Sequence, residues 1–358
     1  CMHQEFSGVW IMAYTTIDNP ELYFQIKNYT GTGSSNAQTF DGSEDMQPDM
    51  VWIKARSDAF SQMLYDVSRG VQKHIKPDSN AAEATDSNSL TAFGSDGFTV
   101  GSNSDINNSS DTYVAWCWNT QGGAGSSNTD GSINTTTTSV GQTQGMSIST
   151  YTGTGSNATV GHGLGAAPEM LIIKRRQTSE WLVYHKGTAS DPETDYMVLH
   201  GTGAIVDNAT AWQDTAPTST VFSIGTYTDI NTSGGTMVVY AMRSIQGFSK
   251  FGSYTGNGNA DGTFVYTGFK PKTLLVKSIA AGGGWYMMPS LKTWVNGDTY
   301  YLYPYSSTTE SNSAFVDFHS NGFKLRKNDD VNNAAGYLYA CWAEAPFVNS
   351  NGVPNNAR

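Results

Sequence analysis

The hexapeptide YTGTGS occurs twice in this chain, at Tyr29–Ser34 and at Tyr151–Ser156, and a near copy, YTGNGN, occupies Tyr254–Asn259. Each copy is followed, 17 to 19 positions after its tyrosine, by a proline that opens an apolar stretch ending in lysine. These stretches read PDMVWIK, PEMLIIK and PKTLLVK, and they begin at Pro48, Pro168 and Pro271. Short continuous apolar runs of this kind are typical of buried strands.

Two further landmarks recur in the same order. A phenylalanine follows each lysine by about 45 positions, and a closing strand, YVAWCW, MVVYAM or YLYACW, comes next. The phenylalanines are Phe98, Phe222 and Phe323, and the fifth residues of the closing strands are Cys117, Ala241 and Cys341. Four landmarks repeated three times indicate three copies of one unit of about 100 residues, the size of an independently folding domain and larger than a solenoid repeat.

The composition favours β structure in every copy. Only 14% of the residues are charged, aromatic residues reach 12%, and there are 38 glycines. Amphipathic runs with helical periodicity are nearly absent, whereas turn residues separate many short apolar stretches. We therefore predict an all-β protein of three tandem antiparallel β-sandwich domains, jelly-roll or lectin-like, of about 100 residues each.

The landmarks also place the domain boundaries. We predict an N-terminal extension at 1–11, three repeats at 12–118, 146–247 and 248–347, a linker at 119–145 after the first repeat, and a polar tail at 348–358. The linker is rich in Gly, Ser, Thr and Asn and carries one charged residue, Asp130, so we expect it to be extended and flexible. The second and third repeats are almost contiguous, and we expect them to pack rigidly against each other.

The paired glycines of the hexapeptides first suggest a phosphate-binding loop. The stretch GHGLGAAP at 161–168 strengthens that impression, but a proline and an apolar strand follow it. A dinucleotide site needs a helix there, so the context excludes this interpretation. We instead predict that the first glycine of each hexapeptide adopts a positive φ in a turn near the start of its repeat. These glycines are Gly31, Gly153 and Gly256.

Enzyme signatures are absent from the sequence. It contains no nucleophile elbow, HExxH motif or P-loop, and no carboxylate recurs at a matching place in all three copies. We therefore predict that the protein is not an enzyme and needs no cofactor. A carbohydrate-active enzyme is the remaining enzymatic alternative, and it would need paired carboxylates facing a cleft. Structural calcium is a further alternative, because acidic clusters occur at 41–45 and 328–330.

Charge and hydrophobicity limit the partners. A net charge of −11 argues against nucleic acid, because a nucleic-acid binder needs cationic surface to displace counterions. No apolar run approaches the roughly 18 residues of a membrane helix, so we expect no membrane insertion. The matching positions of Cys117 and Cys341 in two closing strands predict buried, reduced thiols.

Aromatic residues of the third repeat are the best candidates for a binding site. The segment TWVNGDTYYLYPY has no counterpart in the first repeat, whereas Trp181 and Trp285 recur at nearly equivalent places and are predicted to be core residues. Aromatic faces can stack on sugar rings, and the nearby Asn and Asp side chains can bind hydroxyl groups. The candidate glycan-binding residues are Trp294, Tyr300, Tyr301, Tyr303 and Tyr305.

Several phrases of the sequence resemble a known group of proteins. MAYTTIDNPELYFQ, TYTGTGSNATVGHGLGAAPEMLIIK, FHSNGFKLR and YACWAEAPF resemble the units of uncharacterised tandem-repeat virion structural proteins, tail-fibre-like, of marine tailed bacteriophages. The resemblance covers nearly all of residues 12–347 and includes no catalytic motif, so it transfers no functional residue.

The resemblance implies a location at the virion surface. It implies a tail-fibre-like appendage whose partners are other virion proteins, further copies of the chain, with a trimer favoured, and host surface glycans. The alternative is a capsid decoration protein or another purely structural virion protein that binds no glycan.

Overall fold

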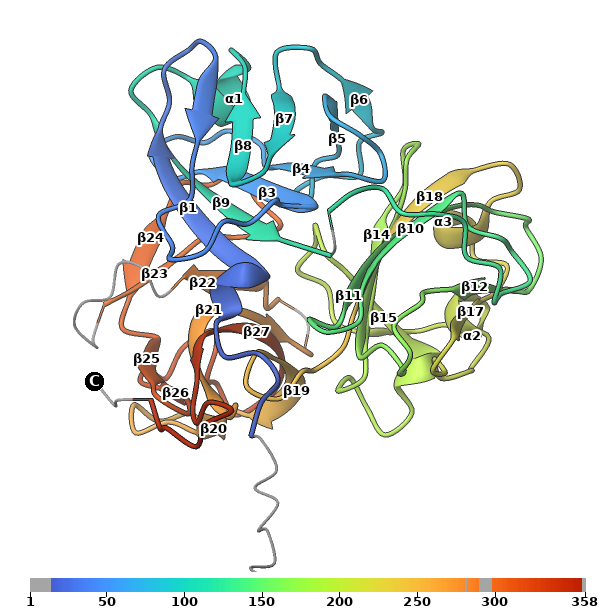
Figure 1. The fold of residues 1–358 in the computed structure, drawn as a ribbon. Coiled ribbons are helices and arrows are strands. Elements are labelled where there is room, and N and C mark those ends of the chain that lie inside the picture. The colour runs from blue at the N-terminus through green and yellow to red at the C-terminus, as the bar shows by residue number, and fades with distance from the viewer. Residues whose placement is uncertain (1–13, 121, 281, 290–297, 356–358) are drawn as a thin grey trace, which may run out of the picture.

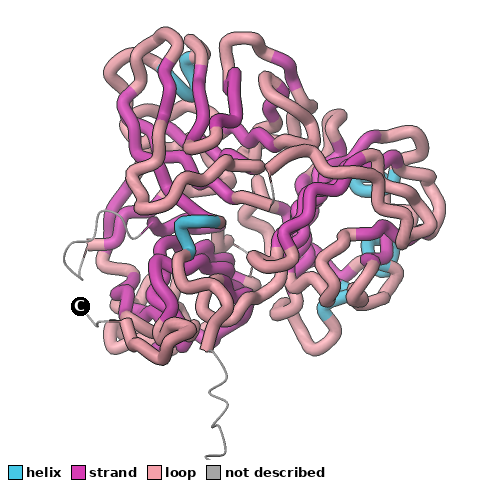
Figure 2. Tube along the Cα trace, in the orientation of Figure 1, coloured by secondary structure: helices cyan, strands magenta, loops and turns pink. Residues whose placement is uncertain are grey.

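The computed structural model describes residues 14–120, 122–280, 282–289 and 298–355. Strands account for 42% of the chain and helices for 5%, and the sheets are antiparallel, which confirms the all-β prediction. The chain forms three units around a common centre, one for each predicted repeat (Figures 1 and 2). The first repeat is coloured blue to cyan in Figure 1, the second green to yellow, and the third orange to red.

The first repeat consists of a four-stranded sheet, a smaller sheet above it and short accessory elements. The four-stranded sheet has the order β1 (Phe24–Thr30), β9 (Thr112–Trp118), β3 (Met50–Ala55), β4 (Met63–Asp66), and the smaller sheet has the order β2 (Asn36–Gln38), β8 (Gly97–Val100), β7 (Leu90–Gly94). The accessory elements are η1 (Pro20–Leu22), β5 (Lys73–His74), β6 (Ala84–Thr85) and α1 (Ser104–Asn107).

The second repeat contains the same four central strands with additions at both edges. Its large sheet has the order β10 (Thr137–Gly141), β11 (Met146–Thr152), β18 (Thr236–Met242), β13 (Met170–Arg175), β14 (Trp181–His185), β15 (Asp195–Val198), β16 (Val206–Asp207). The other elements are the pair β12 (Ala158–Gly161) and β17 (Val221–Ile224), with η2 (Pro192–Thr194), α2 (Ala209–Trp212) and α3 (Thr228–Asn231).

The third repeat returns to four strands in its main sheet. Their order is β19 (Ser249–Thr255), β27 (Gly336–Pro346), β21 (Phe269–Ser278), β22 (Trp285–Pro289), which matches the first repeat strand for strand. The smaller sheet has the order β20 (Phe264–Tyr266), β26 (Gly322–Leu325), β25 (Val316–His319), and β23 (Thr299–Tyr301) pairs with β24 (Ser311–Ser313).

The sequence landmarks occupy equivalent places in these sheets. Each closing strand lies between the opening strand and the strand that follows the landmark proline, so it is hydrogen-bonded on both sides. Pro48 and Pro168 precede their strands, whereas Pro271 lies inside β21 at a register shift, where a ladder hydrogen bond is not required. The three landmark phenylalanines lie in the smaller sheets and are buried, as are the free thiols of the two closing-strand cysteines.

Alternation along the strands divides the core into four clusters. In the first repeat, Trp52 and Trp116 face a central cluster, whereas Ile53 and Cys117 face a cluster between the large and small sheets of that repeat. The second and third repeats have matching clusters of their own. The central cluster contains residues from all three large sheets, and Trp118 of the first repeat contacts Trp342 of the third at 5.3 Å between ring centroids. Both faces of each large sheet are therefore buried, which explains the continuous apolar runs.

The lysine that ends each apolar stretch joins its repeat to a neighbour. The ammonium groups are buried, and each donates across an interface to a backbone carbonyl oxygen. The bonds are Lys54 Nζ to Ser307 O at 2.7 Å, Lys174 Nζ to Asn80 O at 3.2 Å and Lys277 Nζ to Gly203 O at 2.9 Å. The first repeat thus binds the third, the second binds the first, and the third binds the second, which closes a ring of three.

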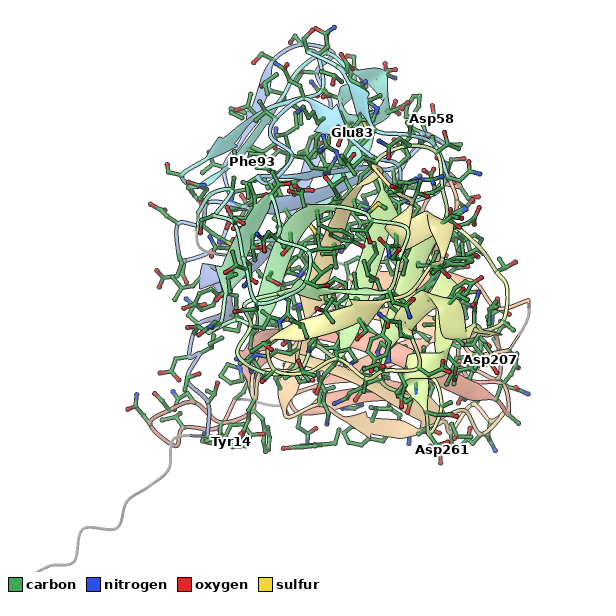
Figure 3. All side chains as sticks on the ribbon, turned by 90° about the vertical axis from the view of Figure 1, so that its right-hand side faces the viewer. Tyr14, Asp58, Glu83, Phe93, Asp207 and Asp261 are labelled. Atoms are coloured by element: carbon green, nitrogen blue, oxygen red, sulfur yellow. The ribbon has the colours of Figure 1, made fainter. Side chains whose placement is uncertain are left out.

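A second set of contacts joins the same three pairs of repeats. Two residues beyond the lysine stand Arg56, Arg176 and Ile279, and the backbone carbonyl of each accepts from an N–H of the neighbouring repeat, that of Glu310, Glu83 or Ile205. In the first two cases the side chains also form ion pairs, at 2.8 Å for Arg56–Glu310 and 2.6 Å for Arg176–Glu83. Figure 3 labels Glu83 where the first and second repeats meet. In the third case two isoleucines pack on the central cluster instead.

The predicted linker does not run freely between the first two repeats. Its residues 137–141 form β10, which pairs with β11 along its length, and Ile133 forms a parallel bridge with Val160. Thr138 and Ser139 are buried, and their hydroxyls bond to Thr135 and Thr120 at 2.7 Å. The prediction of a flexible linker was wrong for this part, because β-branched threonines that satisfy one another can extend a sheet.

The positive-φ prediction named the wrong glycine of each pair. Positive φ occurs at Gly33, Gly155 and Gly258, at 69°, 76° and 63°. The first glycine is required by close packing instead, because a Cβ at Gly31 would lie 2.0 Å from Asn108 O. A buried asparagine side chain accepts a hydrogen bond from the backbone of each hexapeptide loop. In the first repeat, Asn107 accepts from Thr32 N at 2.9 Å. Each loop therefore binds an asparagine side chain of its own repeat.

Candidate functional site

The structure places the predicted glycan-binding tyrosines in a packed aromatic group. Tyr301, Tyr303 and Tyr305 are half-buried, and the ring centroids of successive members lie 5.3 and 5.2 Å apart. Tyr301 and Tyr303 pack on the core cluster of the third repeat, and Tyr305 packs on the central cluster. Tyr300 is half-buried on β23, and Trp294 lies outside the described residues.

The same segment also serves the interface with the first repeat. Gln62 donates to the carbonyl oxygens of Tyr303, at 2.6 Å, and Ser306, at 3.1 Å. Trp181 in the second repeat and Trp285 in the third occupy the position that Gln62 has in the first repeat. Their indole N–H groups likewise donate across an interface, to Ser79 O and Val198 O, both at 3.0 Å. The tyrosine segment therefore contributes to the ring of repeats, with its rings packed on one another.

An open cleft of about 410 Å³ lies between the second and third repeats, beside the N-terminal segment. One wall is formed by Tyr266 of β20 and by Tyr14, which Figure 3 labels at the lower end of the molecule. Glu169 and Lys186 of the second repeat form the other wall, and Lys250 of β19 contributes to the floor. Three segments that are far apart in the sequence thus meet at this cleft.

The aromatic wall is exposed and held in place. The Tyr266 side chain is 48% exposed, and its hydroxyl lies 2.8 Å from that of Tyr14, which also donates to Gly268 O at 3.2 Å. Lys250 Nζ lies 5.5 Å from the centroid of the Tyr266 ring and donates to Tyr266 O at 2.8 Å. Burial and the hydrogen bond to Tyr266 raise the pKa of Tyr14, so its hydroxyl stays protonated at neutral pH.

The opposite wall carries charged and polar groups. Glu169 forms an ion pair with Lys186 and accepts from the hydroxyl and the backbone N–H of Ser244. The Lys186 side chain is 45% exposed, so part of its ammonium group faces solvent. An exposed ring opposite paired donors and acceptors can stack on the apolar face of a sugar and bind its hydroxyls.

Sequence reasoning missed Tyr14 and Tyr266 because neither belongs to a repeated motif. The register of the small sheets places Thr39 and Gly161 at the positions equivalent to Tyr266. Lys250 likewise stands opposite Cys341 where Gln25 stands opposite Cys117. A comparison of the repeats position by position would have found these substitutions, since an exposed aromatic residue replaces a small one only in the third repeat.

The acidic clusters weighed as calcium ligands have partners in the structure. Asp41 pairs with Lys27 at 2.7 Å and Asp329 with Lys327 at 2.5 Å, while Asp330 accepts from the hydroxyl of Tyr286. Within residues 14–120, 122–280, 282–289 and 298–355, no group of three or more His, Cys, Asp and Glu side chains is arranged to hold a metal ion.

Comparison with known proteins gives a family and no activity. The model of a family described as a domain of unknown function, DUF7483, matches residues 19–346. No curated protein matches the chain. In the part of the chain that the structure describes, no helix has the length and apolar character needed to cross a membrane.

Proposed function

Because the chain belongs to the DUF7483 family, whose description names no activity, we propose a function from its own residues. The protein is a structural component of a bacteriophage virion surface, a tail-fibre-like appendage that binds host surface glycans in the cleft beside Tyr266. Under this proposal each repeat is a β-sandwich domain of the jelly-roll or lectin-like kind, and the ring of three repeats is a rigid base for the binding site.

Two kinds of observation support the proposal. The phrases of the repeats resemble those of virion structural proteins, and the sequence contains no catalytic motif. The repeats are also joined through a shared apolar cluster and buried cross-repeat hydrogen bonds, which suits a body that must keep its shape outside a cell. Neighbouring virion proteins and further copies of the chain, with a trimer favoured, are the expected partners.

The exposure of Tyr266 is the observation that carries glycan binding. Tyr266 is 48% exposed at a cleft of about 410 Å³, whereas Tyr301, Tyr303 and Tyr305 are half-buried against one another. A sugar can therefore stack on Tyr266 without displacing a neighbouring ring. The ion pair of Glu169 and Lys186 and the ammonium group of Lys250 can supply the hydrogen bonds.

A glycan array and a pair of matched variants test this site. Tyr266→Ala is expected to weaken binding by about fivefold or more, since an aromatic contact contributes about 1 kcal/mol. Phe264→Ala is the control, because Phe264 is 45% exposed on the same strand and does not line the cleft. Wild-type protein that binds no glycan, or equal affinities of the Tyr266→Ala and Phe264→Ala variants, would exclude the cleft as a glycan site.

A purely structural virion role, such as capsid decoration, is the second candidate. The shared core and the closed ring of contacts favour it, because a structural subunit needs shape and no ligand. Electron cryomicroscopy of the intact particle separates the two roles. Ordered copies on the head lattice would support decoration, whereas a few copies at the tail would support a fibre.

A further inference from the structure

The three opening strands share one structural feature, an edge position in the four-strand pattern of their repeat. The hexapeptide tyrosines align β1, β11 and β19, so that Asn28, Thr150 and Ser253 are equivalent residues. Each opening strand pairs on one side with the closing strand of its repeat. What lies on the other side differs among the repeats.

In the second repeat the outer edge is covered from Met146 to Thr150. Strand β10 pairs with β11 from Thr137 opposite Thr150 to Gly141 opposite Met146. Thr136 N donates to Thr150 O at 2.7 Å, and the hydroxyls of Thr137 and Thr150 lie 2.8 Å apart. Thr150 is only 5% exposed as a result.

In the third repeat, a single residue of this edge is bridged by another described residue. The chain arrives directly from β18, so only Ile245 bridges to Ser249. The next outward N–H, that of Phe251, donates to the side-chain oxygen of Ser244 at 3.1 Å, which takes the place of a backbone carbonyl. Beyond this point Ser253 is exposed.

In the first repeat the outer edge of β1 has no covering strand in the described part of the chain. Gly31 N donates to Asp111 O, and Asn119 N to Tyr23 O, so odd-numbered residues direct their backbone groups toward β9. Alternation then directs those of Ile26 and Asn28 outward. No described residue bonds to these outward groups, and Asn28 is exposed.

The course of the upstream segment explains why this edge is open. In the second repeat the residues before the opening strand turn back and form β10. In the first repeat they cross to the second and third repeats, where Thr15 donates to Gln246 O at 2.8 Å and Tyr14 to Gly268 O at 3.2 Å. The segment that could cover β1 is thus engaged elsewhere.

We propose that the outer edge of β1 binds an extended, uncharged, Ser/Thr-rich strand of a partner protein, which adds to the sheet in the antiparallel manner of β10. The occupant is inferred from the chain itself, because TTSVG at 137–141 forms such a strand on the equivalent edge. Backbone hydrogen bonds would supply most of the affinity, as in other cases of strand addition. The surface lies on the first repeat and does not depend on the glycan cleft.

The test uses a labelled peptide of residues 134–142, NTTTTSVGQ, and fluorescence anisotropy with the full-length chain. Asn28→Pro removes the outward N–H, and proline is tolerated at an edge position whose N–H faces solvent. Asn28→Ala removes the same side chain but keeps the N–H, so it is the matched control. Circular dichroism and thermal unfolding show whether the proline variant keeps its fold.

We expect wild-type protein and Asn28→Ala to bind the peptide and Asn28→Pro to bind it about tenfold more weakly, which corresponds to one lost backbone bond. Protection of the Ile26 and Asn28 amides from hydrogen exchange when the peptide is added would support the same assignment. The proposal is overturned by equal binding to Asn28→Pro, by equal binding of a peptide with proline at Ser139, or by no binding at about 1 mM peptide. Self-association that Asn28→Pro abolishes would also overturn it, because a second copy would then be the occupant.

Discussion

Replacement of Lys174 by methionine tests whether the buried lysines hold the ring of repeats together. Lys174 Nζ donates to the carbonyl oxygens of Asn80, Gln177 and Ser179 at 3.2, 3.1 and 2.9 Å. The Asn80 carbonyl belongs to the first repeat, so this bond crosses an interface. Methionine has a similar volume and no donor, and the variant therefore removes the hydrogen bonds and leaves little empty space.

The expected loss follows from two opposing effects. Loss of its donor costs a buried carbonyl about 1–3 kcal/mol. The bond to Ser179 O is buried, whereas those to Asn80 O and Gln177 O are part-buried, so the three losses together cost roughly 3–6 kcal/mol. Burial lowers the pKa of Lys174 from 10.5 to about 8, so removal of the ammonium group recovers about 3 kcal/mol. The free energy of unfolding is therefore expected to fall by about 1–2 kcal/mol.

Urea unfolding followed by tryptophan fluorescence measures this loss. Lys327→Met is the control, because the Lys327 side chain is 45% exposed and its ion pair with Asp329 lies at the surface of one repeat. We expect the control to unfold near the wild-type midpoint and Lys174→Met to unfold at clearly lower urea, in a single transition because the repeats share one core. Equal midpoints for the two variants would refute the argument that the cross-repeat bonds stabilise the ring.

Three further predictions concern pH, the loops and the thiols. Burial lowers the pKa of Lys54, Lys174 and Lys277 to about 8, so between pH 8 and about 10 the unfolded chain binds more protons than the folded chain. The free energy of unfolding, measured with urea, should therefore rise across this pH range, and it should rise less in Lys174→Met. A stability that does not change with pH in this range would contradict the prediction. Above pH 10 stability should fall again, because burial raises the pKa of core tyrosines such as Tyr151. Gly31→Ala should destabilise the protein by more than about 3 kcal/mol, because its Cβ would contact Asn108 O. Gly70→Ala is the control and should cost about 1 kcal/mol, because Gly70 has a φ of 90° but no atom within 4 Å of an added Cβ. Equal shifts in melting temperature would disprove the explanation by close packing. Burial raises the pKa of Cys117 and Cys341, so a thiol reagent should modify them only after unfolding; peptide mapping that finds either residue labelled in the native protein would contradict their burial.

Local patterns in the sequence were sufficient to find the strands and their repetition. A proline that opens a short apolar stretch and a closing strand at a fixed distance can be read from neighbouring residues without a structure. The same patterns could not distinguish the two glycines of each hexapeptide. That distinction depends on Asn108 O, a contact from a residue 77 positions beyond Gly31.

The candidate site was less accessible from the sequence than the fold. The tyrosines of 300–305 were conspicuous because four of them fall within six positions, but neighbouring aromatic residues pack on one another when a core cluster lies beneath them. Tyr14 and Tyr266 are 252 positions apart, and only the return of the N-terminal segment to the third repeat brings their hydroxyls together. No short-range pattern in the sequence indicates this contact between Tyr14 and Tyr266.

The sequence by itself determined that this chain has three related β units, where their strands lie and which strands are apolar, because these properties follow from composition, continuous apolar runs and the fixed spacing of the landmarks. Only the tertiary structure decided that the units share a central core and that the lysine at the end of each apolar stretch bonds to a neighbouring unit. It also decided that one strand edge is covered while another is open. These features depend on burial of both faces of each sheet and on carbonyl groups from distant loops. A buried ammonium group must find such acceptors wherever the fold supplies them.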